Sequence, residues 1–280
     1  MSSPSRIERA PATLAGWAAL FEHAALPVLA TTAASLEELR ANEDAVDARW
    51  LTDVVVADPL MTIKVLAHVA QLRRGREGSE TETITEALVM LGIPPFFRAF
   101  GAQDTAEAWL ADHPEALAGF QRVLQRSRRA ARFATSFAVH RMDHDVGVIH
   151  EAALLHDFAE LLLWLHAPAL ALEIQARQRA DTTLRSAAVQ RDLLHIELDE
   201  LEHALMLKWR LPALLVQITD EHATKTTPQM RNVQLAIRVA RHSADGWDNA
   251  ALPDDVADVG RLLNIAPDTA ARLLREIDAE

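Results

Sequence analysis

The chain has 280 residues, 50% of them hydrophobic, and its 40 acidic and 28 basic side chains give a formal net charge of −12 at pH 7. This length suits one large domain or two small ones, and the acidic balance disfavours nucleic acid and anionic membrane surfaces as partners. The absence of cysteine excludes disulfides, thiolate metal sites and a cysteine nucleophile.

Helix is the secondary structure that the composition favours, since alanine and leucine dominate and the chain has no tyrosine. Apolar residues recur at helical spacing in the first part of the chain, and they predict helices over residues 12–23, 35–42, 47–56, 59–71 and 83–91. Local signals support several boundaries. Asp58-Pro59 suits a cap and first turn, Thr83 and Glu86 have capping-box spacing, and Gly92 ends a helix before two prolines.

A helix with a turn is expected between Phe96 and Pro114, followed by a long helix over 114–141 and a polar loop over 142–147. The remaining helices are predicted over residues 150–166, 169–179, 182–194, 197–209, 212–221 and 230–242, with a helix–turn–helix tail over 253–280. The sequence therefore predicts an all-α fold. No stretch of 18 uncharged apolar residues and no secretory signal is present, so we expect a cytoplasmic protein that does not contact a membrane.

Several short motifs follow one another at a fixed order and spacing. They are Leu26-Pro27, Val56–Leu60 with Lys64–Leu66, Thr83–Ala87 leading into Leu91-Gly92, Ala152–Asp157 with Leu161–Leu163, and Trp209–Pro212 with Ile218 and His222. Together they resemble the HDOD family, a non-hydrolytic relative of the HD-domain phosphohydrolases, over about Leu26–His222. The resemblance implies a helical subdomain over 12–113, an HD-like helical bundle over 114–222 and a C-terminal extension over 223–280.

The resemblance also implies a regulatory role beside kinases, response regulators or cyclic di-GMP enzymes. Active HD enzymes hold metal ions with a histidine on one helix, a His-Asp pair on a second and a further aspartate. Here His156 and Asp157 remain, but Arg126 occupies the place of the upstream histidine, and Glu221 replaces the first histidine of a pair whose second member is His222. A guanidinium offers no lone pair to a cation and repels it.

These four residues, Arg126, His156, Asp157 and His222, are therefore interpreted as the remnant of an HD site without metal, cofactor or catalysis. We expect His156 and Asp157 to lie on a helix, mostly buried, near His222. A diverged metal-dependent phosphohydrolase or cyclic di-GMP phosphodiesterase is the alternative.

A second feature is a cluster of arginines, Arg122, Arg126, Arg128, Arg129 and Arg132, on one predicted helix. The cluster is interpreted first as a solvated helix face paired with nearby acids. Alternatively, Arg122, Arg126 and Arg129 form a patch that binds an anion or an acidic partner, and a groove around His156 and this cluster senses a small ligand such as a nucleotide. The acidic residues of the tail argue against DNA binding, and we expect the tail to be a small packing or docking module.

Overall fold

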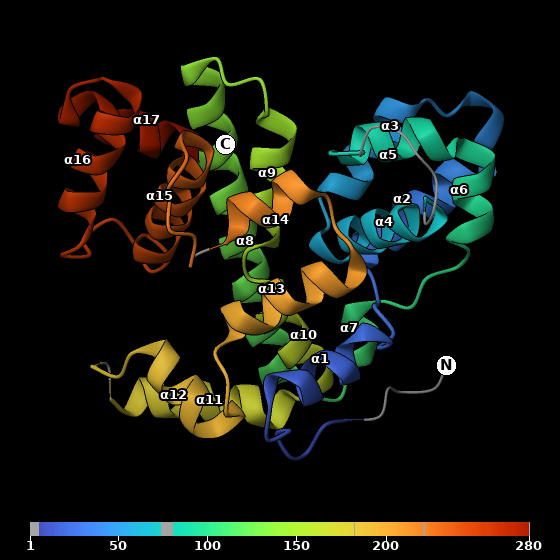
Figure 1. Cartoon of the computed structure of the whole chain (residues 1–280), viewed down its shortest axis with the longest axis horizontal. Coiled ribbons are helices and arrows are strands. Elements are labelled where there is room, and N and C mark those ends of the chain that lie inside the picture. The colour runs from blue at the N-terminus through green and yellow to red at the C-terminus, as the bar shows by residue number, and fades with distance from the viewer. Residues whose placement is uncertain (1–5, 74–80, 182, 221, 280) are drawn as a thin grey trace. The chain divides into compact units, whose positions relative to one another are not determined.

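The computed structural model of the chain describes residues 6–73, 81–181, 183–220 and 222–279 (Figure 1). Throughout these residues the regular structure is helical, and the single backbone pairing of the β type is an isolated bridge between Val28 and Thr105. The prediction of an all-α fold is therefore confirmed. The polar stretch over 73–82, which separates the helices predicted over 59–71 and 83–91, reads as a loop, and its residues 74–80 lie outside the described residues.

The helices divide into two compact units that interleave along the chain. Unit 1 comprises Met1–Val123 and Asp157–Pro212, and unit 2 comprises Leu124–His156 and Ala213–Glu280. The division cuts the long helix α8 (Pro114–Arg141), which begins in unit 1 and continues in unit 2. The units are thus not contiguous in sequence, unlike the three segments expected above, and the assignment of an HD-like bundle to 114–222 stays a prediction.

Unit 1 is built from helices that come from both of its chain segments. They are α1 (Leu14–Glu22), α2 (Ala30–Ala41), α3 (Ala48–Val56), α4 (Pro59–Leu72), α5 (Ile84–Leu91), α6 (Ile93–Ala99), α7 (Ala106–Trp109), the first turns of α8, α10 (Phe158–His166), α11 (Pro168–Ala180), α12 (Ser186–Leu194) and α13 (Leu198–Trp209), with a 3₁₀ turn at Glu43–Ala45.

The two segments of unit 1 share one apolar core. Trp17 of α1 is fully buried, stacks on Phe21 and donates a hydrogen bond of 2.9 Å from its indole nitrogen to the carbonyl oxygen of Leu194. A second contact joins α8 to α10, because a Cβ at Gly119 would lie only 2.4 Å from the nearest ring carbon of Trp164. Glycine at this position lets the large indole pack directly against the backbone of α8.

Unit 2 contains the rest of α8, then α9 (Val146–Leu155), α14 (Ala213–Thr219), α15 (Pro228–His242), α16 (Leu252–Leu263) and α17 (Pro267–Ala279). Helix α9 packs against α14 and α15, α15 packs against α16, and α16 packs against α17. The fully buried Asn232 of α15 donates a hydrogen bond of 3.2 Å to the carbonyl oxygen of Ala134 in α8. The helix–turn–helix form predicted for the tail is confirmed.

Several of the predicted helix boundaries are wrong, including the starts of α9 at Val146 rather than 150 and of α12 at Ser186 rather than 182. The single helix predicted over 150–166 is two helices, α9 and α10, separated by a turn at His156-Asp157. Helix α2 begins at Ala30 rather than near residue 35, and a new helix, α6, begins directly after Gly92 because Pro94 and Pro95 occupy its first turn. Gly92 itself has a φ of 77°, which favours glycine.

Candidate functional site

The segment that follows the Leu-Pro motif contacts the Asp-Pro-Leu motif at Asp58, the buried N-cap of α4. One carboxylate oxygen accepts hydrogen bonds from the backbone nitrogens of Leu60 (2.9 Å) and Met61 (3.2 Å), and the other accepts one from Leu29 (2.8 Å). The carboxyl is completely buried, and burial raises its pKa, while these hydrogen bonds act in the opposite direction. Asp58 thus starts its own helix and fixes the backbone at the start of α2.

Lys64, one turn further along α4, makes a second link to the same segment. Its ammonium donates hydrogen bonds to the carbonyl oxygen of Leu26 (2.8 Å) and to the side chain of Gln103. Burial lowers the pKa of the Lys64 ammonium, and the negative charges of Asp58 and Asp104 oppose that effect. Asp58 and Lys64 therefore hold the segment from Leu26 to Leu29 against α4.

His166, the last residue of α10, is a buried histidine that belongs to none of the sequence motifs. Its Nε2 atom donates a hydrogen bond of 3.1 Å to the carbonyl oxygen of Ala25, and its ring packs edge-on against Phe21 and Trp109. Burial lowers the pKa of His166 to about 4. The neutral ring therefore acts as a structural fastener of unit 1 at neutral pH.

His156 and Asp157 lie in the turn between α9 and α10, and both are half-buried. The prediction that they lie on a helix is wrong, whereas only a minor part of either residue is exposed, which agrees with the burial expected for them. The apolar residues on either side do form helices, but the helical hydrogen-bonding pattern is interrupted at this pair, which ends one helix and begins the next.

The four residues of the remnant HD site fall in both units. Arg126, His156 and His222 belong to unit 2, and Asp157 is the first residue of the second segment of unit 1. Arg126 is a half-buried residue of α8. His222 is exposed just after α14, where its backbone nitrogen donates to the carboxylate of Asp220 (2.9 Å). Helices α9 and α14, which precede His156 and His222, pack against each other. The closeness of the four side chains stays a prediction, and Glu221 lies outside the described residues.

A metal site needs several nitrogen or oxygen ligands that converge on one point. In the described ranges of the chain, no group of three or more His, Asp or Glu side chains has the arrangement that could hold a metal ion. Near the remnant site, Nδ1 of His150 lies 3.0 Å from the hydroxyl of Thr135, which gives this histidine a hydrogen-bonding role.

The arginine cluster of α8 divides by environment. Arg129 is mostly buried and makes a two-point ion pair with Asp278 of α17, with distances of 2.7 Å from Nε and 2.9 Å from Nη2. It also donates to the hydroxyl of Ser243 (2.8 Å). Arg129 therefore fits the first interpretation, in which the arginines pair with nearby acids. Its guanidinium already binds groups of this chain.

Arg122, by contrast, is exposed at the rim of a groove between α8 and α11 in unit 1, with a volume of about 540 Å³. The floor is formed by small or apolar side chains, and the polar rim includes Arg179 from α11. Two acids, Glu115 and Glu173, also line the groove, and Glu173 pairs with Arg177 at 2.9 Å. No ion pair between described residues involves Arg122 or Arg179, so the groove presents two arginines beside the acids Glu115 and Glu173.

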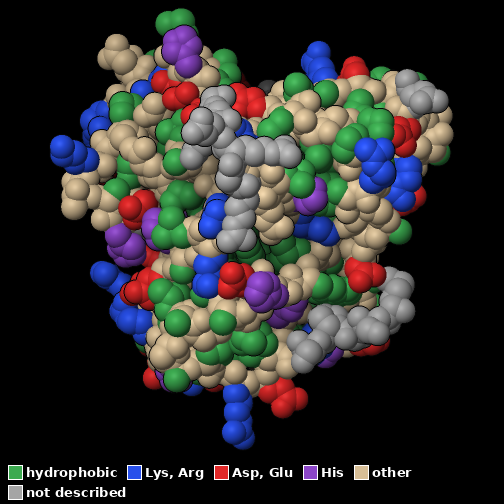
Figure 2. All heavy atoms as spheres, turned by 45° about the vertical axis from the view of Figure 1, so that its right-hand side comes forward, with side chains coloured by type: hydrophobic (Ala, Val, Ile, Leu, Met, Phe, Trp, Pro, Cys, Tyr) green, Lys and Arg blue, Asp and Glu red, His purple; other side chains and the backbone are tan. Residues whose placement is uncertain are grey.

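On the face shown in Figure 2, Lys and Arg side chains lie among Asp and Glu side chains and small apolar areas. Among the helices of the described residues, none has the combination of length and hydropathy that a bilayer span requires.

The architecture is shared with solved structures of low sequence identity. The MmoQ response regulator from Methylococcus capsulatus superposes with a TM-score of 0.67 at 22% identity, over 89% of this chain and 98% of that protein. A virulence factor from Campylobacter jejuni gives a TM-score of 0.63 at 15% identity, over 90% and 91% of the two chains. At these identities the likeness shows a common fold.

An HDOD domain protein from Geobacter sulfurreducens gives a TM-score of 0.50 at 15% identity and covers 94% of this chain and 95% of its own. A comparison with curated proteins finds no match. The sequence model of the HDOD domain matches residues 26–225, which include the Asp58 contacts, the His156-Asp157 turn and the segment that ends at His222. The chain belongs to the HDOD family.

Proposed function

We propose that this protein is a non-catalytic signal-transduction protein that acts by binding protein partners. The observation that carries the proposal concerns the His156-Asp157 pair. No third His, Asp or Glu in the described part of the chain completes a ligand group with these two residues. Because a bound metal needs about three protein ligands even when water completes its shell, two residues are too few for tight binding.

The residues around the pair support the same function. Arg126 stands where the related hydrolases have a histidine, and its permanent positive charge repels a cation. Ala159 and Glu160 follow the pair in place of the glycine and lysine usual in the family. A domain with this site can still transmit a signal, because partner binding requires a shaped surface and no reacting group.

The family and the fold give this proposal its context. One structural neighbour is named a response regulator. Kinases, response regulators and cyclic di-GMP enzymes are accordingly the partner classes that we propose, with the cytoplasm as the compartment.

The test is elemental analysis of the full chain purified without chelators, followed by hydrolysis assays on phosphomonoesters, nucleotides and cyclic di-GMP with added manganese. We expect no stoichiometric iron, manganese or zinc and no turnover, and we expect Arg126→His to remain inactive. Stoichiometric metal together with turnover that is lost in His156→Ala would overturn the proposal and establish the hydrolase instead.

The groove beside Arg122 supports a second candidate function, the sensing of a small anionic ligand. Two arginines without ion pairs flank an apolar floor, an arrangement that suits a phosphate or carboxylate group on a larger molecule. A thermal-shift screen against nucleotides tests this, since a ligand that binds only the folded state raises the melting temperature. The shift should vanish in Arg122→Gln and persist in Arg49→Gln, which removes an exposed arginine of α3.

A further inference from the structure

The helical hairpin formed by α16 and α17 lies beyond the residues that match the HDOD family, which end at 225. It carries a large share of acidic residues and is joined to α8 and α15 by ion pairs. All of these pairs between described residues run in one direction, with the acid on the hairpin and the base on α8 or α15. The hairpin therefore covers a basic face.

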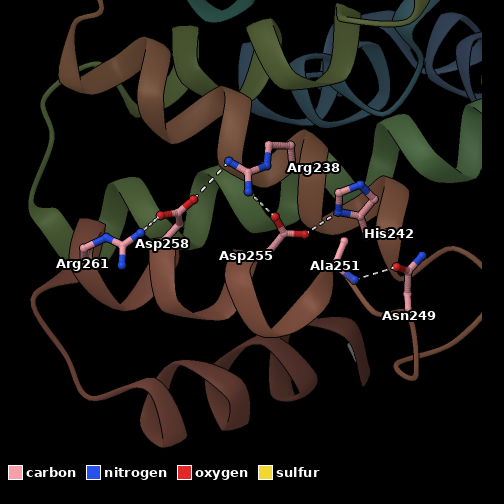
Figure 3. A network of polar contacts seen from close by, with 7 residues as sticks. All are labelled: Arg238, His242, Asn249, Ala251, Asp255, Asp258 and Arg261. Carbon is pink, nitrogen blue, oxygen red and sulfur yellow. Dashed lines mark hydrogen bonds and ion pairs between the residues drawn. The ribbon is translucent and has the colours of Figure 1, made fainter. Parts of the chain in front are cut away.

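The first set of contacts joins α15 to α16 (Figure 3). The carboxylate of Asp255 is completely buried, and it accepts from the guanidinium of Arg238 and from Nδ1 of His242. Arg238 also reaches the neighbouring Asp258 at 3.1 Å, and Asp258 contacts Arg261 on its own helix. One face of α15 thus presents two cationic or hydrogen-bond-donating groups to one acidic helix.

The second set of contacts holds α17. Asp278 receives both prongs of the Arg129 guanidinium from α8, and its Oδ2 also accepts a hydrogen bond of 3.2 Å from the indole nitrogen of Trp247. Arg132 lies 4.0 Å from the same carboxylate. The guanidinium of Arg275 stacks over the Trp247 ring at 5.4 Å. A carboxylate near the end of the chain thus occupies a site with the donors that recognise anions.

Between these two clamps the hairpin buries an apolar stripe that includes Val259, Leu263, Leu274 and Ile277. An amphipathic helix with an apolar stripe and flanking acids is the form in which many partner peptides dock into a groove. We propose that the hairpin is an intramolecular ligand of the basic face on α8 and α15, and that an acidic amphipathic helix of a partner protein displaces it. This inference rests on the proposed function and names the partner surface.

The ion pairs that hold the hairpin allow a partner helix to displace it. The side chain of Arg238 is 44% exposed and that of Asp258 is 20% exposed, so salt and solvent weaken chiefly this pair, whereas Asp255 is fully buried. Arg129 is only 16% exposed, so loss of Asp278 leaves a largely buried charge that needs another carboxylate. A partner helix that supplies an acid at this position replaces the contact without leaving Arg129 unpaired.

The experiment uses the full chain and a fluorescent peptide with the sequence of residues 252–280. The peptide is titrated into the wild type, into Asp278→Asn and into Asp192→Asn, which removes the same charge from an exposed ion pair with Arg177 in unit 1. We expect Asp278→Asn to bind the peptide at least tenfold more tightly than the wild type does, and Asp192→Asn to match the wild type. Added salt should weaken the binding, and a peptide with asparagine at both 255 and 278 should bind at least tenfold more weakly.

Hydrogen exchange on the wild type gives a measurement that does not depend on the folding of a variant. We expect amides of α16 and α17 to exchange at least tenfold faster than those of α15, because the hairpin opens while the rest of unit 2 stays folded. Equal exchange rates, or equal peptide binding by Asp278→Asn and the wild type, overturn the proposal. Concentration-dependent dimers of Asp278→Asn in light scattering also overturn it, because a second copy then supplies the hairpin. None of these outcomes alters the metal and turnover results that test the proposed function.

Discussion

Gly119 in α8 is predicted to be a position where alanine destabilises the protein, although alanine favours helices. A methyl group there would lie 2.4, 2.5 and 2.7 Å from three carbons of the Trp164 ring, whereas carbon atoms in contact are normally about 3.5–4.0 Å apart. Trp164 is 3% exposed, so its ring cannot move aside without leaving the core. Overpacking costs about 1–3 kcal/mol and loss of a whole tryptophan about 3–5 kcal/mol. The better helix propensity of alanine returns about 1 kcal/mol.

Because the clash displaces the Trp164 ring, the larger cost applies, and after the gain in helix propensity we expect Gly119→Ala to lower the free energy of unfolding by about 2–4 kcal/mol. Urea unfolding followed by circular dichroism measures this as a lower midpoint at an unchanged slope. Gly101→Ala is the control, since no atom lies within 4 Å of the added carbon, and it should change stability by less than about 0.5 kcal/mol. The double variant Gly119→Ala, Trp164→Leu should be more stable, by about 1 kcal/mol or more, than the sum of the two single losses predicts. A stabilised Gly119→Ala variant, or an additive double mutant, would refute the steric argument.

Two further predictions concern buried ionisable side chains. The pKa of His166 falls from 6.5 to about 4 on folding, so its contribution to stability is complete above pH 6.5 and is lost as the pH falls towards 4. At pH 5 this loss amounts to about 2 kcal/mol relative to pH 8, and urea unfolding of His166→Gln at both pH values should lack it. Asp58→Asn should cost about 1–3 kcal/mol of stability. Asparagine has only one oxygen that accepts hydrogen bonds, so it cannot accept both from Leu29 and from the start of α4. Asp47→Asn is the control, because this exposed N-cap accepts a hydrogen bond from Trp50 and asparagine caps a helix as well as aspartate does. An equal loss of stability in both variants would contradict the role assigned to Asp58.

Signals that act over a few residues determined much of this fold. Helical periodicity predicted the all-α class, and the cap residues Asp58 and Thr83 start α4 and α5 as expected, because each binds backbone nitrogens within its own first turn. The order of short motifs also indicated the HDOD family, since spacing along the chain is a property of the sequence itself. In the candidate site, the sequence identified Arg126, His156, Asp157 and His222, but not their environments.

Tertiary structure decided whatever depends on partners distant in the chain. Helix α2 begins at Ala30 because Glu107, 77 residues away, accepts a hydrogen bond of 2.8 Å from its nitrogen. No glycine or proline marks the break at His156-Asp157, and the two units divide the chain at that pair. Arg129 meets Asp278 across 149 residues, so its pairing left no trace in the local pattern. Local sequence sets backbone preferences within a turn or two, whereas only the folded chain brings together donors and acceptors that are far apart.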